Sequence, residues 1–343
     1  MSIEKITIRK PDDMHFHLRY GLMLQNVLPF SSCVFGRGVV MGNLFPPVDD
    51  AKSIVDYRRE ILSMSPGFDP IMAMMLTRKT TVEILDDAYR AGAKVLKFIP
   101  GTASTGGAQG LDLPDLYNLR HILEAVRDRG MIFSCHFELT TKDGCPVSML
   151  EQEQEAIPFA EHLVDAIPGL KLVVEHVSSV EMIEFVKSAP SNVAATLTAH
   201  HAIITCEDVF DKDRIIDPFL FCKPIAKMEG DRKMIREAMI GGDPKFFFGS
   251  DSAPHNIMKK RGKSPVAGIF SSPVALPLLC QIFEEEGALG KLENFTSLYG
   301  AQFYGLPLNE GTVTIEKRSW TVPDSYEYVK IFMGGREMKW RVC

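Results

Sequence analysis

Eight short apolar runs, alternating with segments of helical periodicity, constrain the fold of this chain more than any other feature of its sequence. The runs are rich in β-branched, methionine and aromatic residues, as buried strands are. They lie at residues 14–18, 38–42, 70–76, 93–99, 130–136, 170–175, 193–198 and 245–250. The helical segments lie at 49–63, 80–90, 114–128, 149–165, 179–187, 229–240 and 273–285. Because most runs are apolar on both faces, we predict an α/β fold of the (β/α)8 TIM-barrel class instead of an open sheet.

The domain organisation follows from the length and from the pattern near the C-terminus. A chain of 343 residues would suit two average domains, but barrels of this class often exceed that average as one unit. Residues from about 308 to 343 carry alternating or short apolar runs, including Val313, Ile315 and Val329. We therefore expect residues 1–343 to form a single barrel domain with a small C-terminal β extension.

The charge and the apolar pattern exclude several classes of partner. The formal net charge is −6, and no long run of lysine and arginine occurs, which argues against a nucleic-acid or anionic-membrane surface. The N-terminus lacks an apolar signal core, and no stretch approaches the roughly 18 apolar residues of a membrane span. We expect a cytoplasmic protein whose partners are small molecules and other copies of itself.

The seven cysteines include no Cys-x-x-Cys pair and are odd in number. This pattern favours reduced cysteines over a disulfide framework or a thiolate zinc site. We expect most of them to be buried as small apolar residues.

The segment Asp12–Arg19 contains the first candidate metal ligands. In an extended strand His15 and His17 point to the same side and stand roughly 6–7 Å apart, a separation at which two imidazoles can share one cation. The alternative is a pair of ordinary polar strand histidines. The rest of the chain decides between them, because further ligand-type residues end later strands.

Four other strands end in residues that can bind a metal. Lys97 lies near the end of the run at 93–99, His136 and His176 follow two later runs, and Asp251 follows the last. Taken singly, His136, His176 and Asp251 would each be interpreted as a buried polar residue whose hydrogen bonds are satisfied. Lys97 taken singly would be interpreted as half of a buried ion pair. Because the strands of a barrel end on one face, the set converges there, and nitrogen and oxygen donors of this kind suit zinc.

The order of these residues resembles the ligand order of the metal-dependent amidohydrolase superfamily. More narrowly, three segments resemble the dihydroorotase family in its shorter, bacterial-type class: Met41–Pro47, Gly249–His255 and Tyr299–Pro307. The likeness extends from about residue 9 to residue 307. It implies reversible interconversion of N-carbamoyl-L-aspartate with L-dihydroorotate and water, the third step of de novo pyrimidine (UMP) biosynthesis.

The same resemblance implies a site with two zinc ions per subunit. In that arrangement His15, His17 and Asp251 bind the more buried ion, and His136 and His176 bind the second. A carbamylated Lys97 (N6-carboxylysine) and a hydroxide bridge the two ions. Asp251 is the implied catalytic residue, carrying a proton between the attacking oxygen and the ring nitrogen. A homodimer is expected from the family alone.

Recognition of an acidic substrate requires cations and hydrogen-bond donors. Arg19 lies two residues after His17, on the same side of the strand, where its guanidinium can form a forked pair with the substrate carboxylate. The alternative role is a surface salt bridge. By the resemblance, Asn43, His255 and the backbone of Ala267 join it.

A second group of expected substrate contacts is less regular. Ser104 and Thr105 lie in the glycine-rich segment 101–110, which in the family closes over the substrate; a mobile solvent loop is the alternative. Lys223 stands beside the ring site where close relatives carry an apolar residue. Tyr20 stands where relatives often carry an aspartate. Both departures affect the expected positioning of the substrate.

Two other functions remain open from the sequence. A related cyclic amidase of the hydantoinase or dihydropyrimidinase type would use the same metals, but such enzymes usually carry a second β-sandwich, for which this chain has no room. A non-catalytic amidohydrolase-like scaffold is the other alternative. Every implied ligand position is filled here, which favours an enzyme.

Overall fold

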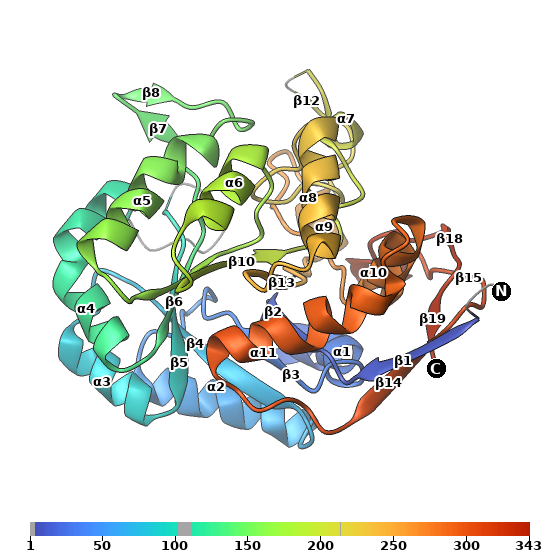
Figure 1. Cartoon of the computed structure of the whole chain (residues 1–343), viewed down its shortest axis with the longest axis horizontal. Coiled ribbons are helices and arrows are strands. Elements are labelled where there is room, and N and C mark those ends of the chain that lie inside the picture. The colour runs from blue at the N-terminus through green and yellow to red at the C-terminus, as the bar shows by residue number, and fades with distance from the viewer. Residues whose placement is uncertain (1–3, 102–110, 213) are drawn as a thin grey trace.

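The computed structural model describes residues 4–101, 111–212 and 214–343. Its centre is an eight-stranded sheet in which neighbouring strands pair in parallel (Figure 1). Each strand overlaps one of the eight predicted runs, which confirms the (β/α)8 barrel. The strands are β2 (Asp12–Phe16), β3 (Arg37–Val40), β4 (Asp69–Met75), β5 (Ala93–Phe98), β6 (Ile132–Cys135), β9 (Lys171–Val174), β10 (Val193–Leu197) and β13 (Phe246–Phe248).

The barrel closes between β13 and β2 by contacts just beyond the end of β13. The amide of Asp251 donates to the carbonyl of His15 at 2.8 Å, and the amide of His17 donates to the carbonyl of Ser252 at 2.9 Å. Phe16 and Ser252 form an isolated parallel bridge at the same place. The closing seam therefore contains three of the predicted metal ligands.

Helices pack around the outside of the barrel (Figure 1). They are α1 (Gly21–Ser32), α2 (Ala51–Met64), α3 (Val82–Arg90), α4 (Arg120–Asp128), α5 (Ile157–Ala166), α6 (Val180–Ser188), α8 (Glu229–Gly241) and α10 (Ala275–Glu285). Side chains cap several of them: the Ser179 hydroxyl, for example, accepts from the amide of Met182 at the start of α6. A 3-10 helix (Leu113–Leu119) runs directly into α4.

Among the outer helices, α5 and α1 depart most from the sequence-based prediction. The segment predicted as helix over 149–165 becomes α-helical only from Ile157, where Pro158 fits the first turn. Helix α1 was not predicted. It lacks a side-chain cap, contains Pro29, and is apolar on much of its circumference, so its amphipathic signal is weak.

The barrel interior is apolar at the end opposite the site. Val39, Val95 and Phe247 belong to a buried cluster inside the strands, and the aromatic residues of α11 (Tyr299–Tyr304) pack against it. The rings of Phe247 and Phe303 are 5.8 Å apart. A second, larger cluster fills the space between strands and helices. The candidate metal ligands therefore lie at the carboxyl ends of the strands, whereas the amino ends of β2 and β3 carry a buried ion pair between Asp12 and Arg37.

The chain ends meet beside the barrel. Strands β1 (Lys5–Arg9), β14 (Thr312–Glu316) and β19 (Arg341–Val342) form an antiparallel sheet that brings the termini together (Figure 1). Val313 and Ile315 of the predicted β extension lie on β14. Other short helices are α7 (Cys206–Val209), α9 (Ile257–Lys260), two 3-10 helices (Gln154–Ala156 and Leu289–Lys291) and a π-helix (Asn294–Leu298). Short strands form four further pairs: β7 (Thr141–Lys142) with β8 (Cys145–Pro146), β11 (Phe210–Asp211) with β12 (Arg214–Ile215), β15 (Trp320–Thr321) with β18 (Glu337–Met338), and β16 (Ser325–Tyr326) with β17 (Val329–Lys330).

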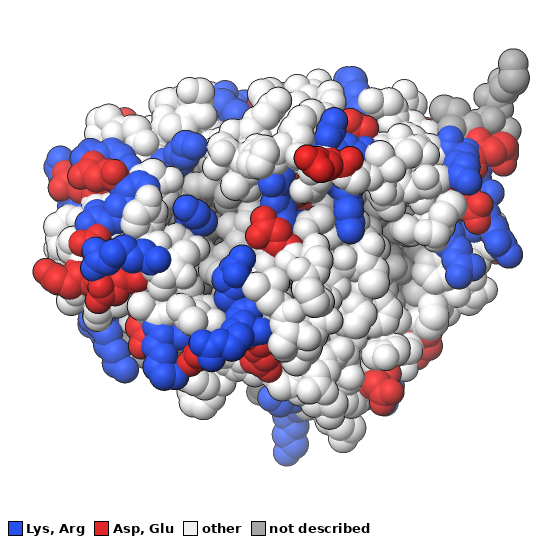
Figure 2. Space-filling view, turned by 90° about the horizontal axis from the view of Figure 1, so that it is seen from below, with Lys and Arg blue, Asp and Glu red and all other residues white. Residues whose placement is uncertain are grey.

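Charged side chains of both signs lie on the surface. On the face in Figure 2, basic side chains lie among acidic ones and form no continuous basic stripe. Within the described ranges, no helix has the length and apolar character needed to cross a membrane.

All seven cysteines are free, as predicted. Cys33, Cys145 and Cys343 are exposed, however, and Cys206 is half-buried. Only three of the seven are buried, so the expectation that most cysteines are buried is wrong.

Candidate metal centre and substrate cleft

A cleft opens at the carboxyl ends of the barrel strands, where the active sites of this fold lie. Most of the predicted site residues line it: His15, His17, Arg19, Asn43, His136, His176, Lys223, Asp251, His255 and Ala267. Ser104 and Thr105 lie outside the described residues. Lys97 is fully buried on β5.

His15, His17 and Asp251 form the first ligand-type group. One oxygen of Asp251 lies 3.1 Å from Nε2 of His17 and 3.4 Å from Nε2 of His15. The two rings are 5.3 Å apart between centroids. Two nitrogens and one oxygen are thus directed to one point, where a cation would replace the shared protons.

His136 and His176 form the second group. Nδ1 of His136 lies 3.2 Å from Nε2 of His176, and the ring of His176 is 5.0 Å from that of His15. The other nitrogen of His136 donates to the Glu138 carboxylate at 2.7 Å. That bond fixes the tautomer and leaves the lone pair of Nδ1 facing His176.

Lys97 does not form the buried ion pair that was the alternative to a functional role. Its Nζ atom is buried and, within the described part of the chain, has no hydrogen-bond or ion-pair partner. Burial lowers the pKa of Lys97, although the charges of Glu175 and Asp251 oppose that shift. A buried amine without a partner is costly and requires an explanation.

Glu175 is a site residue to which the sequence analysis assigned no role. Its side chain is buried and accepts from Nδ1 of His15 at 2.6 Å and from the Thr196 hydroxyl at 2.6 Å. The Ser134 hydroxyl donates to its other oxygen. Because a carboxylate can only accept, Nδ1 of His15 carries the proton, and the lone pair of Nε2 is free to bind a metal.

The backbone at the strand ends is unusual where these groups are carried. His176 and Asp251 have φ values of 43° and 41°, in the left-handed region that non-glycine residues seldom adopt. Such conformations persist only where surrounding contacts hold them, and they are frequent at functional sites. Gly249 is required nearby, because a Cβ atom there would lie 2.9 Å from the Cβ atoms of both His15 and Thr196.

The protonation states suit cation binding. Burial lowers the pKa of His17 to about 4 and also lowers the pKa values of His136 and His176. These imidazoles are therefore neutral at pH 7. Burial acts to raise the pKa of Asp251, but hydrogen bonds from His15 and His17 outweigh it, and the net pKa lies well below the usual range.

One wall of the cleft is suited to a carboxylate. The Nε–H of Arg19 donates to the carbonyl of Pro254 at 3.1 Å, and its Nη2 donates to Nε2 of His255 at 3.0 Å. Burial and the neighbouring guanidinium lower the pKa of His255 to about 2, so this ring is a neutral acceptor. Arg19 is therefore held in place, and within the described ranges it forms no salt bridge, which argues against its alternative role. Asn43 is buried beside it, and its side-chain oxygen has no partner among described residues.

Lys223 closes the cleft near the second histidine group. Its ammonium donates to Gln152 at 2.8 Å and lies 3.4 Å from the Glu138 carboxylate, which in turn holds His136. Lys223 therefore reaches a candidate metal ligand through one carboxylate. Tyr20 packs edge-on against Tyr57 with ring centroids 4.9 Å apart.

Comparisons of sequence and of structure find similar relatives, although no family model matches the chain. The chain is 40% identical over 344 residues to a dihydroorotase of Sphingopyxis alaskensis, with 99% of each covered. Its structure resembles the crystal structure of dihydroorotase in complex with 5-fluoroorotic acid from Saccharomyces cerevisiae, with a TM-score of 0.93, 28% identity and 99% of each chain covered. A dihydroorotase from Campylobacter jejuni gives a TM-score of 0.89 at 32% identity, covering 100% of this chain and 98% of that one.

An L-hydantoinase (dihydropyrimidinase) from Arthrobacter aurescens is also similar in structure. The TM-score is 0.83 at 17% identity, and the match covers 98% of this chain and 83% of that one. At this identity the likeness shows a shared fold alone.

Proposed function

Since this chain belongs to the dihydroorotase family, whose members hydrolyse a cyclic amide bond, we propose that it interconverts N-carbamoyl-L-aspartate with L-dihydroorotate and water. This reaction is the third step of pyrimidine synthesis. The observation that carries the proposal is the convergence of four imidazoles and a carboxylate near a buried lysine that has no hydrogen-bond partner among the described residues.

The donor set fits two zinc ions. His15, His17 and Asp251 would hold one, and His136 with His176 would hold the other. Bound zinc would supply Lewis acidity and would lower the pKa of a water molecule held by it. All five side chains offer nitrogen or oxygen. The pKa values of His17, His136, His176 and Asp251 leave their lone pairs available at neutral pH. Burial acts to lower the pKa of His15, but the charge of Glu175 outweighs it and raises that pKa, so zinc would displace a proton from this imidazole.

The buried position of Lys97 fits a carbamate bridge between the ions. Its neutral amine would add to CO2 to give a carbamate and release one proton. The product replaces an unpaired buried amine with an anion, which suits a position between two dications. Glu175 faces the same region and would hold His15 in the metal-binding tautomer.

The other residues would bind and orient the substrate. Arg19, Asn43 and His255 lie together and would bind the carboxylate that does not react. Asp251 is within reach of two imidazoles and would carry the proton between the attacking oxygen and the ring nitrogen, in either direction. Ala267 would contribute backbone groups beside the ring.

Two further proposals rest on the family resemblance. They are that the active form is a homodimer, which sedimentation would test, and that the protein acts in the cytoplasm.

The proposed function is tested by comparing dihydroorotate with hydantoin and dihydrouracil as substrates of the zinc-loaded protein. Ring opening of dihydroorotate, lost in Asp251→Asn with zinc still bound, is the expected result. A preference for hydantoin would assign the chain to the other cyclic amidases. Protein that binds no zinc and opens neither ring would favour a non-catalytic scaffold.

A further inference from the structure

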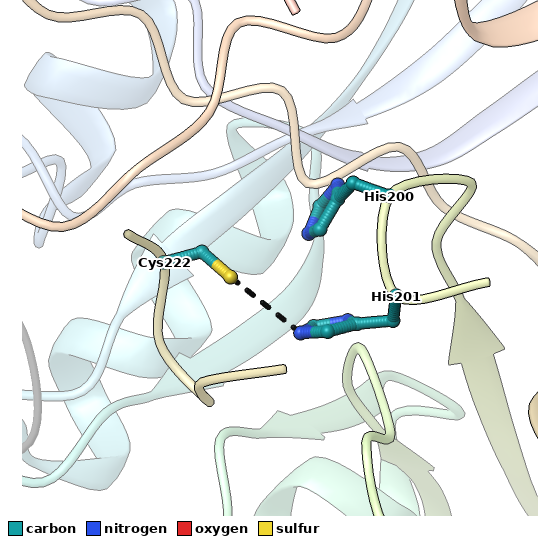
Figure 3. A group of neighbouring side chains, drawn as sticks. All are labelled: His200, His201 and Cys222. Atoms are coloured by element: carbon teal, nitrogen blue, oxygen red, sulfur yellow. Dashed lines mark hydrogen bonds between the residues drawn. The ribbon is translucent and has the colours of Figure 1, made fainter. Parts of the chain in front are cut away.

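A second cluster of ligand-type side chains lies outside the catalytic group (Figure 3). His200 and His201 follow β10, and Cys222 belongs to the loop that carries Lys223 into the cleft. All three side chains are buried, and one donor atom from each lies within 4.8 Å of the others. Figure 3 shows the thiol and both rings turned toward one another.

His200 is the member that most needs an explanation. Its side chain is completely buried, yet neither ring nitrogen has a hydrogen-bond partner among the described residues. Its neighbours include the ring of His201, with centroids 4.5 Å apart, and that of Phe332, at 6.3 Å. A buried imidazole always has at least one N–H and one lone pair unless it is charged, so leaving both unused is costly. A cation would use the lone pair.

The other two members are spaced as ligands of one zinc ion would be. The Sγ atom of Cys222 lies 3.6 Å from Nε2 of His201. Zinc bonds of about 2.3 Å to sulfur and about 2.1 Å to nitrogen, at a tetrahedral angle, place the two ligand atoms about 3.6 Å apart. The carbonyl of Pro224 lies 3.0 Å from the nitrogen and 3.2 Å from the sulfur, and so supplies a fourth donor.

We propose that His200, His201, Cys222 and the Pro224 carbonyl bind a zinc ion that is separate from the catalytic pair. Binding would release the thiol proton of Cys222, giving a thiolate. His201 stays neutral: its proton moves from Nε2 to Nδ1, which then donates to the Thr198 hydroxyl, 2.9 Å away. The Pro224 carbonyl exchanges two hydrogen bonds for the cation, and the Thr198 hydroxyl changes from donor to acceptor toward His201.

The charges around the cluster are mixed. Zinc with one thiolate leaves a net positive charge, which Asp251 and Glu138 attract and Lys227 and Lys260 oppose. The lack of a Cys-x-x-Cys pair in the sequence argued against a thiolate zinc site. Here the two histidines and the cysteine lie on separate segments that only the fold brings together.

The site would stabilise one wall of the catalytic cleft. Cys222 and Pro224 flank Lys223, which lines the cleft and contacts the carboxylate that holds His136. A cation joining this loop to the segment after β10 would restrict the movement of Lys223. This inference concerns metal binding and does not rest on the proposed reaction.

Cobalt substitution tests the proposal without any activity measurement. The full-length protein is freed of metal, titrated with Co2+, and monitored in the near ultraviolet for thiolate-to-cobalt charge transfer. The catalytic group offers only nitrogen and oxygen, so this absorption reports the proposed site. We expect it in the parent protein and in Cys280→Ser, which removes a buried cysteine of α10, and not in Cys222→Ser.

His200→Gln provides the second variant, because His200 makes no hydrogen bond with the described residues and its replacement leaves the contacts of His201 intact. We expect it to fold like the parent, to lose the charge-transfer absorption, and to bind one cobalt ion fewer per chain. Absence of the absorption in the parent, or its persistence in either Cys222→Ser or His200→Gln, would overturn the proposal. If the protein retains this absorption but binds no zinc at the catalytic group, that result would count against the proposed function and would leave the proposed site at Cys222 unaffected.

Discussion

Replacement of Glu175 by glutamine tests the role that the structure adds to the site. The carboxylate accepts from His15 Nδ1 at 2.6 Å and so reserves the lone pair of Nε2 for a metal. A glutamine of nearly the same shape offers either a neutral oxygen or an NH2 group to that nitrogen. The first weakens the bond, and the second reverses the tautomer, so that Nε2 is protonated where the metal should bind.

The free-energy cost of this replacement differs between the two orientations of the glutamine amide. Exchanging a charge-assisted bond for a neutral one costs about 1 kcal/mol, and the tautomer change costs more. Partners of ligating histidines typically contribute about 10- to 100-fold in metal affinity, which corresponds to about 1.4 to 2.7 kcal/mol. We therefore expect zinc to dissociate about 10- to 100-fold more readily from Glu175→Gln.

Chelator competition measures the zinc affinity of the folded protein directly. The matched control is Glu153→Gln, since Glu153 is equally buried and accepts from the amide and hydroxyl of Ser178 but is hydrogen-bonded to no candidate ligand. The control should lose stability and keep its zinc affinity. Equal zinc affinities of the parent and Glu175→Gln would refute the reasoning.

Three other predictions concern the same centre. Lys97→Arg should lose the mass of one carboxyl group in native mass spectrometry, because a guanidinium does not add CO2, whereas Lys260→Arg should leave that mass unchanged. Arg19→Ala should raise the KM for dihydroorotate roughly 30- to 150-fold, because it removes about 2–3 kcal/mol of charged hydrogen bonding to the substrate. The change in kcat should be smaller, and an unchanged KM would contradict the assignment. The pKa of His17, lowered by burial to about 4, lies below its unfolded value of 6.5, so the unfolded state binds more protons between these values. The unfolding free energy of metal-free protein, measured by urea titration, should therefore fall by on the order of 3 kcal/mol as the pH falls from about 6.5 to 4. The unfolding free energy of His17→Gln should fall by less. Equal losses in the two proteins would argue against this origin.

The parts of the fold that depend on periodicity could be predicted from the sequence. Strands such as β4 and β5 are continuous apolar runs, and their parallel order places Lys97 and His136 at one end of the barrel. The same logic could not find α1, whose apolar residues are not confined to one face. The start of α5 was placed too early because nothing in residues 149–156 breaks the helical pattern.

Glu175 shows why part of the site could not be predicted. In a regular strand, Glu175 and His176 would point to opposite faces, so one of them would leave the barrel interior. The positive φ of His176 breaks the alternation, and both side chains contact the other ligands: Glu175 meets His15, and His176 meets His136. A left-handed residue that is not glycine has no clear sequence signal. The cluster at His200 was missed for a related reason, because its members meet only through long loops.

A metal ion bound at the seam between β13 and β2 would also restrain the fold. Phe16 and Ser252, which meet there, are separated by most of the barrel sequence, so joining them closes a very long chain segment. A cation held by His15, His17 and Asp251 would act on that segment as a removable cross-link, limiting the separation of its ends much as a disulfide does. The ion placed to polarise a substrate would then also fasten the first strand of the barrel to the last.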